Sequence, residues 1–208
     1  MTGIPGAALL VALAYLIGAI PFGLLVGRLT HGVDLREHGS GRIGATNALR
    51  TMGLVGAVLV FGLDAAKGFV AVLLVGLLYD AGPAGTPPWV AAAAGIAAIA
   101  GHIRSVFIGF RGGRGVATFA GSMLATAPWV LAVVVPIFAI VVWRTRYVSL
   151  GSLVGSVLAP VTAAVLAVFG QATLAAVALG VGGAALVTAA HADNIARLRL
   201  GTERRIGA

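Results

Sequence analysis

The sequence predicts an all-α integral membrane protein of about seven helical segments, two of them short. Three observations support this fold class. Hydrophobic residues make up 60% of the 208 residues and charged residues only 10%, whereas about a quarter of a soluble domain is charged. Five apolar stretches each reach the ~20 residues that a helix needs to cross a bilayer. Basic residues form short clusters between the apolar stretches, as in cytoplasmic loops.

The five long apolar stretches cover residues 4–27, 54–79, 89–108, 150–169 and 172–190. No basic signal-peptide segment precedes the first stretch, so we expect it to be retained as a helix. The chain contains 31 glycines, and most of those within the spans are expected to let neighbouring helices pack closely. The chain shows neither a repeat nor a linker, which predicts a single membrane-embedded domain over residues 1–208.

A further apolar stretch, residues 116–143, is interrupted by Ala127 and Pro128. Proline removes an amide donor and disfavours helix at the residue before it. If this stretch crosses the membrane once, the later arginine clusters lie outside the cell. If it forms two short helices, 116–127 and 128–143, every cluster lies inside. We therefore predict two short helices, with the N-terminus outside, the loop at 80–88 outside and the C-terminus inside.

The formal charge of +8 reflects 14 Lys and Arg residues against 6 Asp and Glu residues. No basic domain interleaved with aromatic residues is present, so we expect anionic membrane lipids rather than nucleic acid as partners. The absence of cysteine excludes disulfides and thiolate zinc sites. The four histidines are scattered along the chain, and we expect no metal, no cofactor and no obligate protein partner.

Three polar islands interrupt the apolar chain, and the predicted topology places all of them on the cytoplasmic side. The first, residues 39–50, contains Gly-x-Gly-x-x-Gly. It follows a membrane span rather than a strand, which argues against a dinucleotide-binding fold. Its glycines can turn backbone amides toward an anion, and Arg50 offers a fork suited to phosphate. The alternative is a flexible turn whose arginines face lipid.

The second island, residues 101–118, is not a nucleotide-binding P-loop, because no Gly-Lys-Ser/Thr follows at the required spacing. Residues 111–115 place two arginines and three glycines at the start of an apolar helix, where an anion is favoured. The alternative is that Arg111 and Arg114 only anchor the loop at the cytoplasmic face.

The third island, residues 191–203, follows the last apolar stretch. On a continuing helix His191 and Asn194 share a face. His191 could instead simply end the last span, and the arginines from Arg197 to Arg205 favour binding to phospholipid headgroups. Within the second span, Asp64 and Lys67 lie three residues apart, so they either pair with each other or contact substrate.

Glycine- and cation-rich islands on one membrane face indicate phosphorylated ligands. The sequence lacks the Walker motifs and Mg²⁺-binding carboxylates of an ATP site, and it lacks the Gly-x-Ser-x-Gly elbow of a serine hydrolase. A transporter of a phosphorylated molecule would share the islands, but it should carry cationic residues on both sides of the membrane and often inverted repeats. A structural scaffold does not explain the islands.

The three islands resemble the motifs of the bacterial acyl-phosphate:glycerol-3-phosphate acyltransferases. The matching segments are residues 40–47 (SGRIGATN), 101–118 (GHIRSVFIGFRGGRGVAT) and 191–198 (HADNIARL). Residues 15–23 (YLIGAIPFG) and 63–68 (LDAAKG) resemble the same family. The resemblance covers essentially the whole chain, in order and at fitting spacing.

The resemblance implies a seven-helix, multi-pass enzyme of phospholipid biosynthesis in the cell (inner) membrane, with its active site facing the cytoplasm. It implies transfer of a fatty acyl group from acyl phosphate to the sn-1 hydroxyl of glycerol 3-phosphate, giving lysophosphatidic acid and phosphate without CoA, acyl carrier protein or metal. It also implies direct transfer, the donor's phosphate helping to deprotonate the acceptor. The implied catalytic residues are Ser40, Arg50, Arg114, His191 and Asn194. The residues expected to bind substrate are Gly41, Arg42, Gly44, Thr46, Asn47, Lys67, His102, Arg111, Gly112, Gly113 and Gly115.

The chain departs from the family pattern at three places. Arg42 stands where asparagine is common, Arg104 and Ser105 stand where Phe-Pro is usual, and Arg114 stands where lysine is usual. An arginine fork and a lysine ammonium bind phosphate differently. We expect the departures to affect activity level and substrate preference more than the class of reaction.

Overall fold

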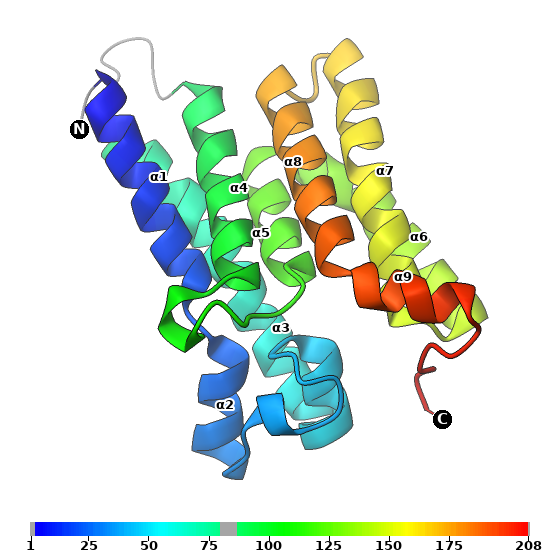
Figure 1. Cartoon of the computed structure of the whole chain (residues 1–208). Helices are drawn as coiled ribbons and strands as arrows, with labels where there is room; N and C mark the ends of the chain where they lie inside the picture. Colours follow the sequence, from blue (N-terminus) through cyan, green and yellow to red (C-terminus); the bar gives the residue numbers. More distant parts are fainter. Residues whose placement is uncertain (1–2, 80–86, 208) are drawn as a thin grey trace.

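The computed structural model describes residues 3–79 and 87–207, and the elements it describes are all helical (Figure 1). Five helical segments are long and apolar enough to cross a membrane, and a bent pair at the C-terminal end makes a sixth. With one shorter apolar helix, this confirms the predicted membrane fold of about seven segments. The elements are α1 (Gly3–Ala19), α2 (Phe22–His31), η1 (Leu35–Glu37), α3 (Ala45–Leu78), α4 (Pro88–Ile103), η3 (Val106–Ile108), α5 (Val116–Thr126), α6 (Pro128–Thr145), α7 (Val148–Val168), α8 (Leu174–Ala190) and α9 (Ala192–Arg199).

Prolines divide the chain at two places. The predicted break at Ala127 and Pro128 is confirmed: α5 ends at Thr126, and Pro128 is the first residue of α6. Proline is tolerated at this position because its missing amide has no partner in the first helical turn. The first apolar stretch was predicted as one helix, but Pro21 separates α1 from α2. Pro21 has no backbone N–H to donate within a continuous helix, so the helix is interrupted there.

The second span is longer than its apolar stretch, because α3 begins at Ala45 rather than near residue 54. At 1.5 Å per residue its 34 residues measure ~51 Å, more than the ~30 Å hydrocarbon core. The backbone kinks at Gly53, whose φ of 72° lies in the left-handed region that glycine adopts without strain. The first turns of α3 therefore carry first-island residues at the polar end of the molecule.

The last predicted helix also differs from the structure. The sequence places His191 and Asn194 on a helix that continues beyond residue 190, but the chain bends by 62° between α8 and α9. His191 occupies the bend. The bend turns the polar α9 away from the direction of the apolar α8 (Figure 1).

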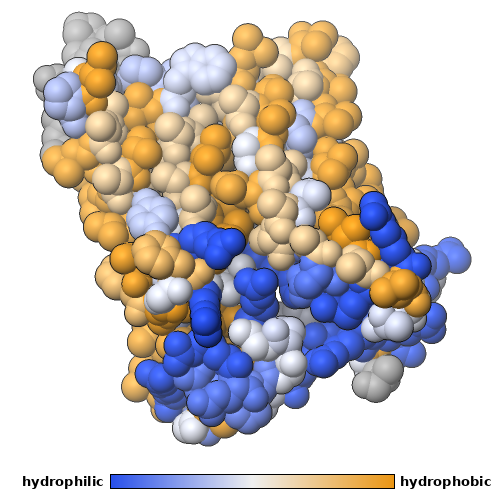
Figure 2. Space-filling view, in the orientation of Figure 1, coloured by the Kyte–Doolittle hydropathy of each residue, from blue (hydrophilic) through white to orange (hydrophobic). Residues whose placement is uncertain are grey.

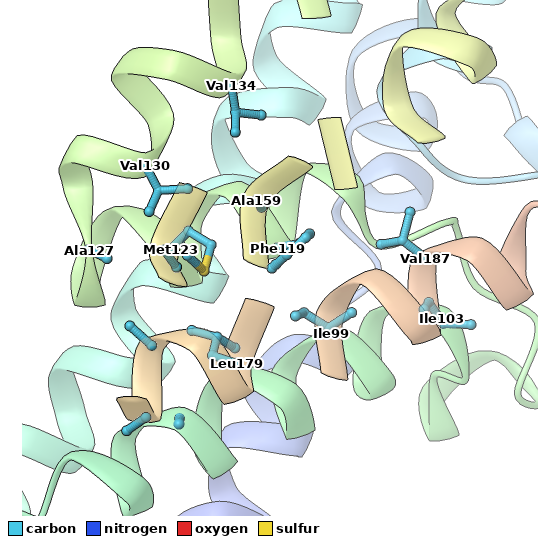
Figure 3. Close-up of a cluster of buried hydrophobic side chains, with 14 residues drawn as sticks. Ile99, Ile103, Phe119, Met123, Ala127, Val130, Val134, Ala159, Leu179 and Val187 are labelled. Atoms are coloured by element: carbon cyan, nitrogen blue, oxygen red, sulfur yellow. The ribbon is translucent and has the colours of Figure 1, made fainter. Parts of the chain in front are cut away.

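The largest apolar core lies between α4, α5, α6, α7 and α8. Phe119 and Met123 of α5 pack among side chains from the four surrounding helices, including Ile99 and Leu179 (Figure 3). Helix approach is closest at small residues, as predicted: a Cβ on Gly18 would lie 2.0 Å from the Ala98 carbonyl oxygen of α4. Glycine therefore allows α1 and α4 to touch through their backbones.

One end of the molecule is polar, and the rest of the face shown in Figure 2 is mostly apolar. Apolar side chains cover the upper part in Figure 2, and hydrophilic residues gather at the lower end, over α2, the segment before α3 and the C-terminal tail. The first helix begins at the opposite end from that tail (Figure 1). The segment predicted to lie outside the cell, 80–88, falls mostly within residues 80–86, outside the described residues.

Candidate active site

A hollow at the polar end collects residues from all three islands. It encloses about 120 Å³ between the segment before α3, the start of α5, the α8–α9 bend and the C-terminal tail. The predicted site residues that line it are Ser40, Arg42, Gly44, Thr46, Asn47, Arg50, His102, Arg114, Gly115, His191 and Asn194. The predicted site residues outside its lining are Gly41, Lys67, Arg111, Gly112 and Gly113.

Asn47 organises the first island instead of presenting free donors to a ligand. Only 2% of it is exposed, and its Nδ2 donates to the carbonyl oxygens of Leu35 and Arg42, each at 2.8 Å. Its Oδ1 accepts the backbone N–H of Ser40 at 2.9 Å. The Asn47 amide therefore shapes the loop that presents Ser40, and its expected contact with substrate stays a prediction. The backbone N–H of Gly41 is likewise used within the loop, by the carbonyl oxygen of His38 at 3.0 Å.

Two helices begin at the wall of the hollow. Gly44 precedes α3 and Gly115 precedes α5, and neither helix start is capped by a side-chain hydrogen bond. The first amides of a helix have no partner within it, and the helix dipole favours negative charge at that end. Both starts line the hollow, so the backbone itself offers donors to an anion there.

Two glycines of the second island, Gly112 and Gly113, use their amides to hold the loop. The backbone N–H of Gly112 donates to Ile103, and that of Gly113 donates to His102, each at 3.1 Å. Both amides are therefore used within the loop, and the substrate contact expected at Gly112 and Gly113 stays a prediction. Arg111 is exposed and does not line the hollow, and its predicted role in binding stays a prediction.

Arg114 is the second-island cation that reaches the hollow, and 15% of its side chain is exposed. Its Nη2 donates to Asp193 Oδ2 at 2.9 Å, while its buried Nε has no partner among the described residues. Burial lowers the pKa of this guanidinium, and the Asp193 carboxylate opposes the shift. An arginine remains charged at neutral pH, so Arg114 keeps a free donor for an anion.

Asp64, Lys67 and His102 form a buried cluster at the wall of the hollow, which Asp64 and His102 line. The predicted pairing of Asp64 with Lys67 is confirmed, with 2.8 Å between Oδ1 and Nζ. Lys67 Nζ also donates to the carbonyl oxygen of Ile20 at 2.8 Å, beside the break between α1 and α2. The ammonium contacts these two partners and does not line the hollow, and the substrate contact predicted for Lys67 stays a prediction.

The third island supplies acceptors rather than donors. His191 Nδ1 lies 2.8 Å from the carbonyl oxygen of Val187, which can only accept, so Nδ1 carries a proton. In the neutral imidazole Nε2 is then an acceptor. Asn194 Nδ2 donates to Glu203 Oε1 at 2.8 Å. Its buried Oδ1 has no partner among the described residues. Both side chains line the hollow although the helix bends between α8 and α9.

Sequence reasoning missed Glu203 as a site residue. Its Oε1 also accepts from Ser149 Oγ at 3.0 Å, and its Oε2 accepts from Arg197 Nε at 2.7 Å. Burial would raise the pKa of this carboxyl, but the hydrogen bonds from Arg197, Asn194 and Ser149 hold its pKa below the usual value. Its three donors leave Glu203 unsuited to act as a base. The sequence did offer one signal for Glu203, which is a single carboxylate among the arginines of the C-terminal tail.

Residues 3–79 and 87–207 contain no group of three or more His, Asp or Glu side chains that could hold an ion. The charged residues in the lining of the hollow are the arginines Arg42, Arg50, Arg114 and Arg204 and the carboxylates Asp64 and Glu203.

The chain is similar to known proteins over nearly its whole length. The model of the glycerol-3-phosphate acyltransferase family matches residues 8–201. The chain is 44% identical over 199 residues to glycerol-3-phosphate acyltransferase 2 of Moorella thermoacetica, covering 96% of this chain and 97% of that protein. It is 43% identical over 201 residues to the glycerol-3-phosphate acyltransferase of Geobacter sulfurreducens, with 96% and 97% covered.

Two crystal structures of an integral membrane glycerol 3-phosphate acyltransferase are similar throughout. The glycerol 3-phosphate form has a TM-score of 0.84 and 38% identity, and the match covers 97% of this chain and 96% of that one. The lysophosphatidic acid form has a TM-score of 0.83 and 37% identity, with 97% and 95% covered.

Proposed function

The chain belongs to the glycerol-3-phosphate acyltransferase family, and from this premise we propose that it transfers a fatty acyl group from acyl phosphate to the sn-1 hydroxyl of glycerol 3-phosphate. The products are lysophosphatidic acid and phosphate. The observation that carries the proposal is the composition of the hollow, which combines cationic donors and helix starts with the side chains of His191 and Asn194.

The hollow suits two anionic substrates that repel each other. Arg50 and Arg114 bring guanidinium groups to it, and the starts of α3 and α5 add backbone donors. Charge-assisted bonds of this kind are about twice as strong as neutral ones. Holding both substrates in a reactive geometry can contribute roughly 7–11 kcal/mol to catalysis.

The acceptors of the third island fit the hydroxyl groups of the acyl acceptor. A phosphate presents only acceptor oxygens once ionised, whereas a hydroxyl can donate to His191 Nε2 or Asn194 Oδ1. In the proposed step the sn-1 hydroxyl oxygen attacks the acyl carbonyl carbon. The bond from that carbon to the phosphate oxygen breaks, the electron pair leaves with the phosphate, and the phosphate takes up the hydroxyl proton.

The surroundings of the hollow fit a lipid-chain donor. Phe61 of α3 and Phe138 of α6 line its apolar side, where an acyl chain can remain between helices while its phosphate lies among the arginines. The site lies at the polar end, which we propose faces the cytoplasm from the inner membrane. We propose that no cofactor, CoA or acyl carrier protein takes part.

A purified sample in detergent or lipid tests the proposal directly. With palmitoyl phosphate and glycerol 3-phosphate we expect equal amounts of lysophosphatidic acid and phosphate, measured by mass spectrometry and a phosphate assay. Palmitoyl-CoA in place of palmitoyl phosphate should give no product. Product from the CoA ester alone would contradict the proposed donor.

A further inference from the structure

The C-terminal tail is held on both sides of Arg204. Glu203 is fixed by Asn194, Ser149 and Arg197. On the other side, the backbone N–H of Ile206 donates to the carbonyl oxygen of Arg146 at 2.8 Å, and Arg146 Nε donates back to Ile206 at 3.0 Å. Ordering a chain end costs conformational entropy, which contacts of this kind must offset. These contacts hold the backbone of Arg204 at the mouth of the hollow.

Arg204 and Arg50 line the same three adjoining hollows of the polar end. Among the described residues, neither guanidinium makes a hydrogen bond or an ion pair. The neighbouring carboxylates are already engaged: Asp193 with Arg114 and Arg197, and Glu203 with Arg197. Two like charges that share a cavity repel each other, and an anion bound between them would relieve that repulsion.

Arg205, the next residue along the chain, has different surroundings from Arg204. Its Nε donates to the Tyr147 hydroxyl at 3.2 Å, and its guanidinium lies 5.3 Å from the centre of the Tyr147 ring. It lines the adjoining hollow whose lining includes Tyr147 and residues 201–207, but not the hollow that collects residues from the three islands. Adjacent arginines in the tail therefore have different environments, although their sequence context is the same.

We propose that Arg204 is a further substrate-binding residue that, together with Arg50, binds a phosphate group in the site. The proposal rests on the proposed function and adds to it a contribution from the C-terminal tail. The phosphate can belong to the glycerol 3-phosphate acceptor or to the acyl phosphate donor. Its chemistry is the same in both cases, a dianion with several acceptor oxygens that matches two guanidinium forks.

The test compares Arg204→Gln with Arg205→Gln as a matched control, using steady-state kinetics with each substrate varied in turn. We expect Arg204→Gln to raise KM for one of the two substrates about tenfold, the loss of one charge-assisted bond, with kcat changed less than threefold. A rise for glycerol 3-phosphate assigns the acceptor's phosphate, and a rise for acyl phosphate assigns the donor's. Arg205→Gln should leave both values within twofold, and Arg204→Lys should recover part of the loss.

Thermal unfolding of each variant, with and without glycerol 3-phosphate or inorganic phosphate, provides a readout besides turnover. Arg204→Gln should unfold at the wild-type temperature without ligand and gain less stabilisation from the ligand whose binding it weakens. If its KM values and ligand stabilisation match those of Arg205→Gln, Arg204 has no binding role. A fall in kcat with unchanged KM values would overturn the proposal equally. If the wild-type chain itself transfers no acyl group, the proposed function fails, whereas the phosphate-stabilisation measurement still decides the role of Arg204.

Discussion

Arg114 brings the charge of the second island into the hollow at a position where the family usually has lysine. Its Nη2 is paired with Asp193, but its buried Nε has no hydrogen-bond partner in the described part of the chain. We expect Arg114→Ala to lower kcat/KM by roughly 100-fold, because a charge-assisted bond of ~2–3 kcal/mol is lost. Arg114→Lys should retain a substantial part, since the charge stays. Steady-state kinetics measure both, with Arg111→Ala as the matched loop control; near-normal activity of Arg114→Ala would remove this residue from the site.

Ser40 is flanked by glycines, as a nucleophile in a tight turn would be, and it lines the hollow. A covalent mechanism needs a base for the serine proton and a group that orients the base. His191 is oriented by the Val187 carbonyl oxygen rather than by a carboxylate. We therefore expect direct transfer, with Ser40 donating a hydrogen bond to substrate phosphate. Ser40→Ala should then lower activity roughly tenfold, the effect of one hydrogen bond to a charged group.

The nature of the intermediate can be measured separately. The wild-type protein and Ser40→Cys are mixed with acyl phosphate alone, quenched rapidly and analysed by intact-protein mass spectrometry. Neither should gain an acyl group. An adduct on Ser40 that forms and decays at the turnover rate would replace direct transfer with a covalent route, in which His191 is the general base.

At the scale of elements, one side chain ties the second island to the break in the first span. Ser105 is fully buried, and its Oγ donates to the carbonyl oxygen of Ala19 at 2.5 Å. The break at Pro21 ends α1 at Ala19, so this carbonyl lies at a helix end where intrahelical partners are missing. The contact gives a physical role to the serine that stands where the family usually has proline.

Ser105→Ala should destabilise the fold by about 1–2 kcal/mol, because it leaves a buried carbonyl without its donor. Equilibrium unfolding in detergent measures the change. Ser156→Ala is a suitable control, because the Ser156 hydroxyl donates only to Leu153 within its own helix. Equal stability of the two variants would show that the Ser105 contact contributes nothing specific.

The tail contact through Glu203 should depend on pH. Its pKa is lowered in the folded protein, so its stabilising effect is present above the unfolded value of 4.5 and is lost as the pH falls through the lower folded value. The stability difference between wild type and Glu203→Gln should therefore be constant from pH 8 to about pH 5 and shrink at more acidic pH. Thermal unfolding at several pH values measures it. A difference that persists unchanged at pH 3 would mean that the charge is not what anchors the tail.

At the scale of the molecule, the first helix begins at the opposite end from the C-terminal tail (Figure 1). With the arginine-rich end facing the cytoplasm, a reporter fused at Gly85 should read as outside the cell, and one fused after Ala208 as inside. Activity assays of periplasmic and cytoplasmic reporters distinguish the two locations. A periplasmic signal from the fusion after Ala208 would refute the seven-segment topology.

The membrane fold could be predicted because its causes are local along the chain. The length of each apolar stretch and the proline at residue 128 are properties of short segments. A helix that satisfies its own backbone bonds is the natural outcome for such segments in lipid. The same holds for the three islands: their residue types pointed to phosphorylated ligands before any contact was known. The extension of α3 to Ala45 was missed because polar residues at its start hid a helix that crosses the Gly53 kink.

The individual roles within the site depended on contacts between distant segments. Residue types alone could not tell Arg114, which reaches the hollow, from Arg111, which does not. They could not tell Asn47, which donates to its own loop, from Asn194, whose oxygen is left free. The 62° bend at His191 and the anchoring of Glu203 bring the tail to the hollow. A buried polar group is stabilised only by the partner that folding places beside it, and that partner is set by packing in three dimensions rather than by neighbours along the chain.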